Sequence, residues 1–553
     1  LERNLYLVEQ IHEMRAPLIV ALNMIDVAEQ RGEEISADLL ALMIGVPVLP
    51  MNAESGEGVG ALVSAIDAFE PAIERRALRD PDPNPDLIPE RYRKIEAICA
   101  EVISRPERRE RTRSDRIDRV LTNRLVGPPI FLALMLVLFT AIFWWATPAM
   151  DLIDAGVGLL AAGVSAVLPE GFVQSLLVDG VIAGVGNVII FLPQLVILFF
   201  ALALLEGSGY MARAAFIMDR MMRRIGLSGR SFIPLLGSFA CAIPGIMATR
   251  TIPSSRDRLA TILVAPFMSC SARLPIYTLV TAAFFPNPLT AGLVVFSMYL
   301  LGIVAAVGTA FLIKRVIFRT EPEPFLMELP PYRIPRWRQI WMMVWVRSMD
   351  FLSRAGTIIL VCTVILWALM TYPRSPEITQ EFEARRAEIT AQGGEDLDEV
   401  LFALAVEENG ALLRHSAAGR LGRLIEPVVK PIGCDWKIGV GIIASFAARE
   451  VFVSTLGVVH SIDEETALDE PRTLAEVLRA DTWPDGSPIF TPLVGITILV
   501  FFVLAMQCMS TLAVVRRETN SWKWPMIQFA YMTTIAYFAA LIVYQGGRLL
   551  GLG

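Results

Sequence analysis

Charged residues are scarce in this sequence, and their scarcity excludes an ordinary soluble globular protein. Of the 553 residues only 19% are charged, 54% are hydrophobic, and the mean hydropathy is +0.53, whereas soluble domains carry roughly 25% charged residues. The basic residues behind the net charge of −7 sit in a few clusters. Nucleic-acid binding needs a sustained basic surface, so we expect no nucleic-acid partner.

Cysteine and histidine are rare as well. The six cysteines are Cys99, Cys241, Cys270, Cys362, Cys434 and Cys508. They show no close-spaced framework, so disulfides are not expected to organise the fold. The three histidines, His12, His415 and His460, lie outside the expected membrane spans. A metal ion inside the membrane would therefore have to be bound by sulfur, carboxylate, hydroxyl or carbonyl groups.

A phosphate-binding loop is missing too. No Gly-x-x-x-x-Gly-Lys-Ser/Thr motif occurs in the chain, and no Asp-x-x-Gly magnesium loop precedes Asn23. Hydrolysis of GTP depends on both loops, so we expect that the chain as written is not a competent GTPase. The chain opens at Leu1 without an initiator methionine or a signal pattern. We read this start as a truncation.

The first 125 residues contain strands alternating with helices. The apolar runs 17–22 and 45–50 have the length of strands, and ligands of such α/β units bind beyond the carboxyl ends of parallel strands. Asn23 and Asp26 follow the first run, and Asn52 and Ala53 follow the second. The Asp26 carboxylate can accept hydrogen bonds from the ring N–H and the amine of guanine. An ordinary turn is the alternative for one loop alone; the two loops together favour a guanine-nucleotide site.

Apolar stretches of about 20 residues, the length that crosses a bilayer, occur only after residue 127. We expect seven spans, the first four at 128–147, 187–206, 259–285 and 289–312, and a later one beginning at Gly356. No Lys or Arg lies between Arg124 and Arg213, so the connection 148–186 is expected outside. The basic run 105–124 places the N-terminal domain in the cytoplasm.

Two further apolar segments, 231–249 and 436–458, are expected to enter the membrane and return. The first contains proline and glycine and is followed by three arginines, which would lie outside if the segment crossed. Such broken segments are tolerated only where protein or a watery cavity shields the backbone, so they usually line a pathway.

Short sequence echoes indicate an internal duplication. Gly186-Asn-Val-Ile-Ile is echoed by Gly356-Thr-Ile-Ile-Leu, Ser238-Phe-Ala-Cys by Ser445-Phe-Ala-Ala, and Met268-x-Cys270-x-x-x-Leu274 by Met506-x-Cys508-x-x-x-Leu512. The charge pattern orients the two halves oppositely. Inverted repeats with broken helices are typical of transporters, with the substrate site near the midplane.

Ionisable and sulfur-bearing residues at membrane depth are the candidates for this site. The ionisable ones are Glu206, Arg273, Arg449 and Glu450. Each arginine is as well explained by structural pairing with Glu206 or Glu450, whereas the two carboxylates are expected to face a cation. Cys241, Cys270 and Cys508 lie beside helix-breaking residues or mirror such a position, and Met211 is a further candidate ligand. Sulfur ligands favour transition metals over magnesium or calcium. Cys99 and Cys362 are interpreted as packing residues.

Four stretches resemble the bacterial ferrous iron transport protein B family. They are Leu205-Glu-Gly-Ser-Gly-Tyr-Met-Ala-Arg-Ala-Ala-Phe-Ile-Met-Asp219, Phe232-Ile-Pro-Leu-Leu, Ile246-Met-Ala-Thr-Arg-Thr-Ile252 and Pro266-Phe-Met-Ser-Cys-Ser-Ala-Arg-Leu-Pro275. Asn23-Met-Ile-Asp26 is similar to that family's guanine-specificity loop. The resemblance implies gate cysteines at Cys241 and Cys270, with Cys508 in the second gate. Ser238 and Ala240 stand where glycines are expected, and Ala448 where symmetry asks for a thiol.

The resemblance also implies the architecture and the partners. The fold expected is a polytopic α-helical membrane protein with inverted-repeat gate regions and two re-entrant segments, preceded by a partial α/β G domain and a small helical domain. The expected bounds are 1–75 for the G domain, 76–124 for a helical domain that inhibits guanine-nucleotide dissociation, and 125–553 for the transport domain, with gates at about 181–282 and 353–515. GTP or GDP with Mg²⁺ is the family's cofactor.

The function expected is uptake of Fe²⁺ across the bacterial inner membrane, gated by the G domain. Small accessory proteins of the same transport system, membrane lipid and further copies of the chain are the expected partners. Mn²⁺ or Zn²⁺ are alternative cargoes, since they share these ligands. A nucleotide-responsive membrane sensor or scaffold is the alternative from another class. An organic-solute carrier is disfavoured because the spans offer sulfur and carboxylates rather than a set of amide groups.

Overall fold

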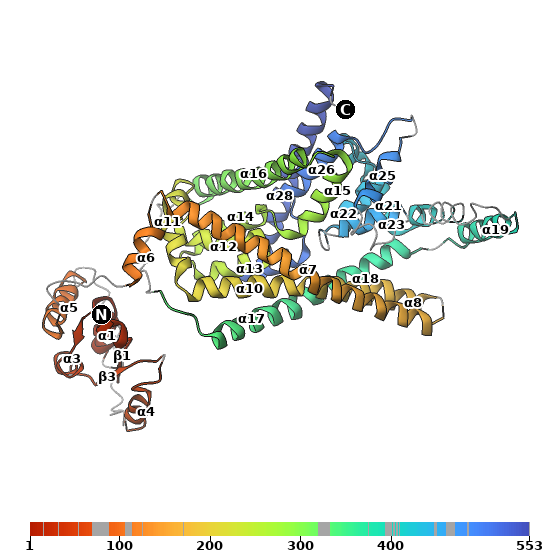
Figure 1. Cartoon of the computed structure of the whole chain (residues 1–553). Coiled ribbons are helices and arrows are strands. Elements are labelled where there is room, and N and C mark those ends of the chain that lie inside the picture. Colours follow the sequence, from red (N-terminus) through yellow and green to blue (C-terminus); the bar gives the residue numbers. More distant parts are fainter. Residues whose placement is uncertain are drawn as a thin grey trace. The chain divides into compact units, whose positions relative to one another are not determined.

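The chain folds as two units, Leu1–Asn123 and Arg124–Gly553 (Figure 1). The structure is a computed structural model. It describes the chain except residues 15, 31, 54, 69–87, 105–112, 124, 170, 319–331, 374, 393–400, 402–403, 405–407, 409, 447–448, 450, 461–470, 484–485 and 552–553.

The first unit combines a pair of parallel strands with helices, which confirms the α/β character expected of the N-terminal segment. Its elements are α1 (Glu2–Glu13), β1 (Val20–Asn23), α2 (Ile25–Gln30), β2 (Glu34–Ile35), α3 (Ala37–Ile44), β3 (Val48–Met51), α4 (Val59–Asp67), α5 (Ile88–Val102), β4 (Ile103–Ser104) and α6 (Arg113–Leu121). β1 pairs in parallel with β3, with Asn23 opposite Met51, and β2 pairs antiparallel with β4.

The core of this unit is shared by elements that are distant in the sequence. Leu22 of β1 and Leu40 of α3 cluster with Ile95, Ile98 and Cys99 of α5. Cys99 is thus a packing residue in the described core. Because α5 fills the same core as β1 and α3, residues 88–102 do not form a core of their own; the boundary at residue 75 remains a prediction.

The second unit is built of helices and broken helices. Its longer helices are α7 (Gly127–Val167), α10 (Leu192–Gly207), α11 (Tyr210–Arg224), α14 (Ser255–Val264), α15 (Leu274–Phe284), α16 (Pro288–Leu312), α17 (Trp337–Phe351), α18 (Thr357–Thr371), α19 (Pro376–Gln392), α21 (Ala417–Val429), α25 (Pro471–Ala480), α26 (Pro492–Leu504), α27 (Met509–Thr519) and α28 (Lys523–Leu549). The short ones are α8 (Phe172–Ser175), α9 (Ala183–Ile190), α12 (Phe232–Ala240), α13 (Ala242–Ala248), α22 (Trp436–Ala444) and α23 (Val451–Val459). Short π-helical segments occur at η2 (Leu176–Ile182), η7 (Ile313–Ile317) and η8 (Leu352–Gly356). Short 3-10 helices occur at η3 (Gly229–Ser231), η4 (Thr249–Thr251), η5 (Ala265–Phe267), η6 (Ser271–Arg273) and η9 (Lys430–Ile432).

Six helical stretches in the described part of the chain are long and apolar enough to cross a membrane. They are Gly127–Val167, Phe172–Gly207, Ser255–Phe284, Pro288–Ile317, Pro492–Thr519 and Lys523–Leu549. The span expected from Gly356 begins with α18, which meets the length only together with the following helix, bent by 70°. α7 differs from its predicted span, because its 41 residues continue past Thr147. At 1.5 Å per residue it is about 60 Å long, twice the hydrocarbon thickness.

Two pairs of short helices fold back on themselves at the segments expected to be broken. α12 packs against α13 and α22 against α23 (Figure 1). Gly245 of α13 allows the first close contact, because a Cβ there would lie 1.9 Å from the Ser238 hydroxyl of α12. In the second pair, Gly441 of α22 faces Phe452 of α23. Helices of seven to nine residues are too short to cross a bilayer alone.

Asp481, which lies after α25 and outside the six apolar stretches, is held by two basic side chains. Lys437 donates to both of its oxygens at 2.7 and 2.9 Å, and His460 Nε2 lies 2.8 Å from Oδ2. Burial would raise the pKa of Asp481, but the hydrogen bonds from His460 and Lys437 outweigh it and lower the pKa to about 2. These contacts fasten the segment after α25 to the start of α22.

Asp481→Asn should lower the stability of the protein by about 2 kcal/mol at pH 7. A lowered carboxyl pKa stabilises the fold above the ordinary value, and this contribution is lost as the pH falls from about 4 to about 2. In detergent, the melting temperature of the variant should therefore lie below that of the wild type at pH 7, and this difference should disappear toward pH 2. Glu377→Gln, at an exposed position on α19, is the control. A difference that persists at the lowest pH contradicts the role of this charge.

Candidate functional site

The two predicted base-binding loops meet at the carboxyl end of the parallel strands. Asn23 Oδ1 accepts hydrogen bonds from the backbone N–H of Ala53 at 3.0 Å and of Met24 at 2.9 Å. The hydrogen bond between the Ala53 N–H and Asn23 thus joins the two loops. Asn52 forms a turn, with its Oδ1 accepting from the Ser55 N–H. Asp26 stands in the first turn of α2.

Met24 adopts a left-handed backbone conformation, with φ +67°. This region is strained for a residue with a side chain and recurs at ligand-binding turns. It separates β1 from α2 within a single residue, which sets Asp26 directly at the start of the helix.

In the membrane unit, the three cysteines predicted for the metal path share one backbone setting. Cys241, Cys270 and Cys508 each have an extended conformation and directly precede the helix that follows. Cys241 separates α12 from α13, Cys270 follows the end of α14 and η5, and Cys508 lies between α26 and α27. All three are partly buried. Cys362 and Cys434, by contrast, lie within α18 and in the buried connection before α22.

Buried arginines cap the carbonyl ends of the two interrupted helices. Arg273 donates to the carbonyls of Pro266 and Phe267 at 2.9 and 3.3 Å. Arg449 does the same from another segment, donating to the carbonyls of Ala505 and Gln507 at 3.1 and 3.2 Å. A guanidinium group stabilises the exposed carbonyls at a helix C-terminus. The alternative pairing of either arginine with Glu206 is wrong, because Glu206 lies 3.3 Å from Arg347.

Further contacts bring the breaks together. The Ser271 hydroxyl donates to the carbonyl of Ala240, which joins the Cys241 and Cys270 breaks. The Met509 N–H donates to the carbonyl of Phe446, at the tip of the α22 and α23 pair. α13 packs against α27, so the helix that follows Cys241 lies beside the helix that follows Cys508.

The other predicted ligands lie apart or outside the described residues. Glu206 ends α10 with an exposed side chain, and Met211 is buried in α11. Glu450 lies outside the described residues. Within the described ranges no three His, Cys, Asp or Glu side chains form a group that could hold a metal ion. The predicted set therefore does not make one compact cluster there.

Two residues near the Cys508 break were not selected from the sequence as candidates. Cys362 lies within electrostatic range of Cys508, and Gln507 is fully buried beside it. The signal for Gln507 was its place next to a cysteine in the echoed motif Met506-x-Cys508. The signal for Cys362 was absent, because α18 contains no charged residue and no helix-breaking residue around it.

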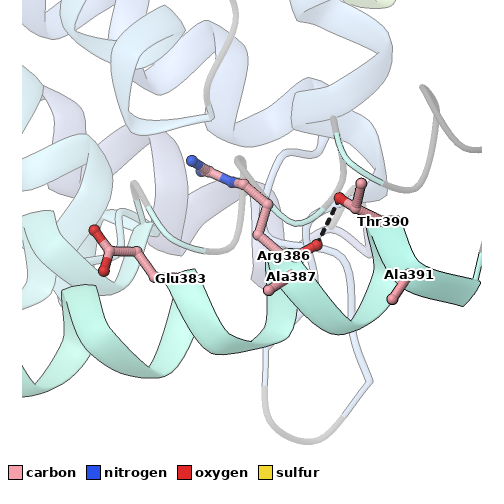
Figure 2. Close-up of a pocket in the computed structure, with 5 residues that line it drawn as sticks. All are labelled: Glu383, Arg386, Ala387, Thr390 and Ala391. Carbon is pink, nitrogen blue, oxygen red and sulfur yellow. Dashed lines mark hydrogen bonds between the residues drawn. The ribbon is translucent and has the colours of Figure 1, made fainter.

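A surface hollow elsewhere has no matching chemistry. It is lined by five residues of the single helix α19: Glu383, Arg386, Ala387, Thr390 and Ala391 (Figure 2). Thr390 donates to the carbonyl of Arg386 in the same helix, as Figure 2 shows. Arg386 also pairs with Glu408. We assign no site to this hollow.

Three family models match the chain. The model described as ferrous iron transport protein B matches residues 1–66, the model for the C terminus of that protein matches 295–347, and a gate model described as nucleoside recognition matches 188–284 and 352–522. The two gate blocks overlap the two predicted gate regions.

Similar proteins extend over almost the whole chain. A protein of Leptospira biflexa named Fe(2+) transporter FeoB is 36% identical, and the match covers all of this chain and 86% of the relative. One of Campylobacter jejuni with the same name is 34% identical over 98% of this chain and 83% of its own. A fusion of Fe(2+) transport protein A with the transporter from Porphyromonas gingivalis is 36% identical, with coverage of 99% and 74%. No solved structure matches.

Proposed function

The chain belongs to the ferrous iron transport protein B family, and from this membership we propose that it carries Fe²⁺ across the bacterial inner membrane along a path between its two gate regions. The main support for this path is the backbone conformation that Cys241, Cys270 and Cys508 share. All three stand in extended backbone at helix breaks, where both thiols and backbone carbonyls can face a passing ion.

The charges around the breaks support a path that uses thiolates. Thiolates rather than thiols bind metals. Arg273 is fully buried and Arg449 is nearly so, and the two guanidinium groups lie within electrostatic range of each other. A metal ion bound by Cys270 and Cys508 would hold them as thiolates, whose negative charge would offset these two arginines.

The two gates are proposed to be inverted repeats with re-entrant tips. The folded-back pairs α12 with α13 and α22 with α23 support this plan. One ion-pair cluster also ties the gates together: Arg250 and Arg258 of the first region both contact Glu518 of α27, at 2.5 and 2.7 Å. A movement of one hairpin would be transmitted to the other gate through this cluster.

The N-terminal unit is proposed to lie in the cytoplasm and to bind a guanine nucleotide, with Mg²⁺ as the family's accompanying ion. The positive-inside rule supports the orientation, and Asn23 joined to Ala53 supports the base site. The fused transport protein A of the Porphyromonas relative supports a small accessory protein as a partner. Assembly into homo-oligomers remains part of the proposal.

Flux of Fe²⁺ into proteoliposomes tests the transport function. Liposomes that contain the purified chain should take up radiolabelled Fe²⁺ under reducing, oxygen-free conditions, and empty liposomes should not. Mn²⁺ and Zn²⁺ in separate assays show which cargo is preferred. Binding of guanine nucleotide without any Fe²⁺ flux would favour a membrane sensor instead.

Asp26→Asn should remove the preference for guanine. An ionised carboxylate that accepts two hydrogen bonds favours guanine over adenine by more than about tenfold, since bonds to charged groups contribute roughly 1.5–3 kcal/mol each. Titration calorimetry with GMP and AMP measures the ratio. Asp38→Asn in the first turn of α3 is the matched control. Retention of the guanine preference in the Asp26 variant contradicts the assignment.

A further inference from the structure

We propose that the side-chain amide of Gln507 is a ligand of the transported cation and sets its specificity; this rests on the proposed transport function. Gln507 lies in the four-residue interruption Ala505–Cys508, next to the proposed thiol ligand Cys508. Its side chain is 0% exposed. Neither its Oε1 nor its Nε2 has a hydrogen-bond partner among the described residues.

A buried amide without partners is unusual and calls for an explanation. Leaving such a group unsatisfied costs roughly 1–3 kcal/mol, and most buried polar side chains in native proteins are paired. The Ser510 hydroxyl, three residues further on, is likewise buried without a described partner. Two unsatisfied polar groups that flank Cys508 point to a ligand that occupies the break during transport.

The first gate shows that the residue directly before the cysteine need not be unpaired. Ser269 precedes Cys270 as Gln507 precedes Cys508. The Ser269 hydroxyl accepts from Arg273 at 3.2 Å and lies 3.2 Å from the Tyr277 hydroxyl. At the second break, Arg449 donates to backbone carbonyls instead, including that of Gln507. Within the described part of the chain, the second gate therefore holds an amide without a partner where the first holds a satisfied hydroxyl.

The chemistry of the amide suits a cation that is bound by mixed ligands. Its carbonyl oxygen is a neutral, hard ligand, whereas the neighbouring Cys508 offers soft sulfur. Carbonyl ligands favour ions such as Mn²⁺, and thiolates favour softer ones. One oxygen added to sulfur ligands shifts the preference away from Zn²⁺ and Cu⁺ and toward Fe²⁺. The amide nitrogen can donate to a water molecule that accompanies the ion.

Kinetics of Fe²⁺ uptake by proteoliposomes test the proposal in the variants Gln507→Leu and Gln507→Met. We expect both to raise the KM for Fe²⁺ by about tenfold, the loss of one interaction worth about 1.4 kcal/mol, and to strengthen competition by Zn²⁺, most of all in the thioether variant. Because both substitutions remove an unsatisfied amide, the protein should fold as well as the wild type.

Gln528→Leu is the matched control. Gln528 is an equally buried glutamine, but its Nε2 donates to the carbonyls of Ile262 and Leu263 at 3.0 and 2.9 Å. Its replacement should lower the melting temperature and leave the KM and the ion preference unchanged. A KM and a Zn²⁺ competition within twofold of wild type in both Gln507 variants overturn the proposal.

The stabilisation of the detergent-solubilised protein by added Fe²⁺ distinguishes a failure of the transport function from a failure of the ligand role of Gln507. Absence of flux in the wild type counts against the transport function. The Fe²⁺-induced rise in melting temperature then still decides the role of Gln507. A smaller Fe²⁺-induced rise in the melting temperature of Gln507→Leu than in that of the wild type supports Gln507 as a ligand. An equal rise overturns this role.

Discussion

The double substitution Cys241→Ser and Cys270→Ser should reduce Fe²⁺ uptake by proteoliposomes at least about tenfold. Serine is nearly the same size as cysteine, so the extended backbone at both breaks can persist, but a neutral hydroxyl is a much weaker ligand for Fe²⁺ than a thiolate. Changes to groups that merely orient metal ligands already cost about 10–100-fold. The Ser271 contact with Ala240 brings these two breaks together, so both substitutions affect one region.

Radiolabelled uptake in the presence of reductant measures this effect. Cys99→Ser provides the control, since Cys99 lies in the core of the N-terminal unit and should leave uptake unchanged. Circular dichroism and elution volume in detergent show whether the variants remain folded. Normal uptake in the folded double variant contradicts the thiol path, whatever the identity of the cargo.

Lys314→Met should destabilise the membrane unit by about 3–5 kcal/mol, because it leaves a buried carboxylate without its partner. Lys314, in η7 at the end of α16, forms an ion pair with Asp257 of α14. The two side chains are only 8% and 6% exposed. Each charge is therefore removed from water and depends on the other for compensation.

A double-mutant cycle separates the pair from the packing around it. Lys314→Met with Asp257→Leu replaces both charges with apolar groups and should recover most of the stability, since replacing a buried pair is often neutral or favourable. Thermal unfolding of the wild type, the two single variants and the double variant in the same detergent gives the coupling free energy between the two side chains. A single Lys314 variant as stable as wild type contradicts the assignment of this pair as buried and mutually dependent.

The sequence could indicate that Cys241 and Cys270 lie at helix breaks, because that signal is local. Cys241 and Cys270 stand beside glycine, serine and proline, and these residues interrupt helices wherever they occur in apolar segments. The α/β character of the first unit could be inferred for the same reason, since polar Asn23 ends one short apolar strand and polar Asn52 directly follows another. The length of α7 could not, because the absence of basic residues indicates sidedness and not where a helix ends.

The partners of the polar groups could not be inferred. Arg449 was as well explained by pairing with a carboxylate as by facing the path, yet it caps carbonyls that lie 56 and 58 residues further along the chain. Glu206 is expected to face a cation, and its contact with Arg347 of α17 was not indicated by the sequence. Hydrogen bonds of this kind depend on which segments pack together, and a single sequence does not contain that information.

The sequence by itself thus determined the family, the separation into an α/β segment and a membrane segment, and the cysteines at the helix breaks, because apolar runs and helix-breaking residues act locally. Only the tertiary structure decided which buried polar groups are satisfied. Ser269 and Gln507 occupy equivalent places in the two echoed motifs, but Arg273 reaches the side chain of the first, and Arg449 is committed to the backbone of the second. That difference comes from the packing of distant segments, and it leaves the amide of Gln507 without a partner among the residues that the structure describes.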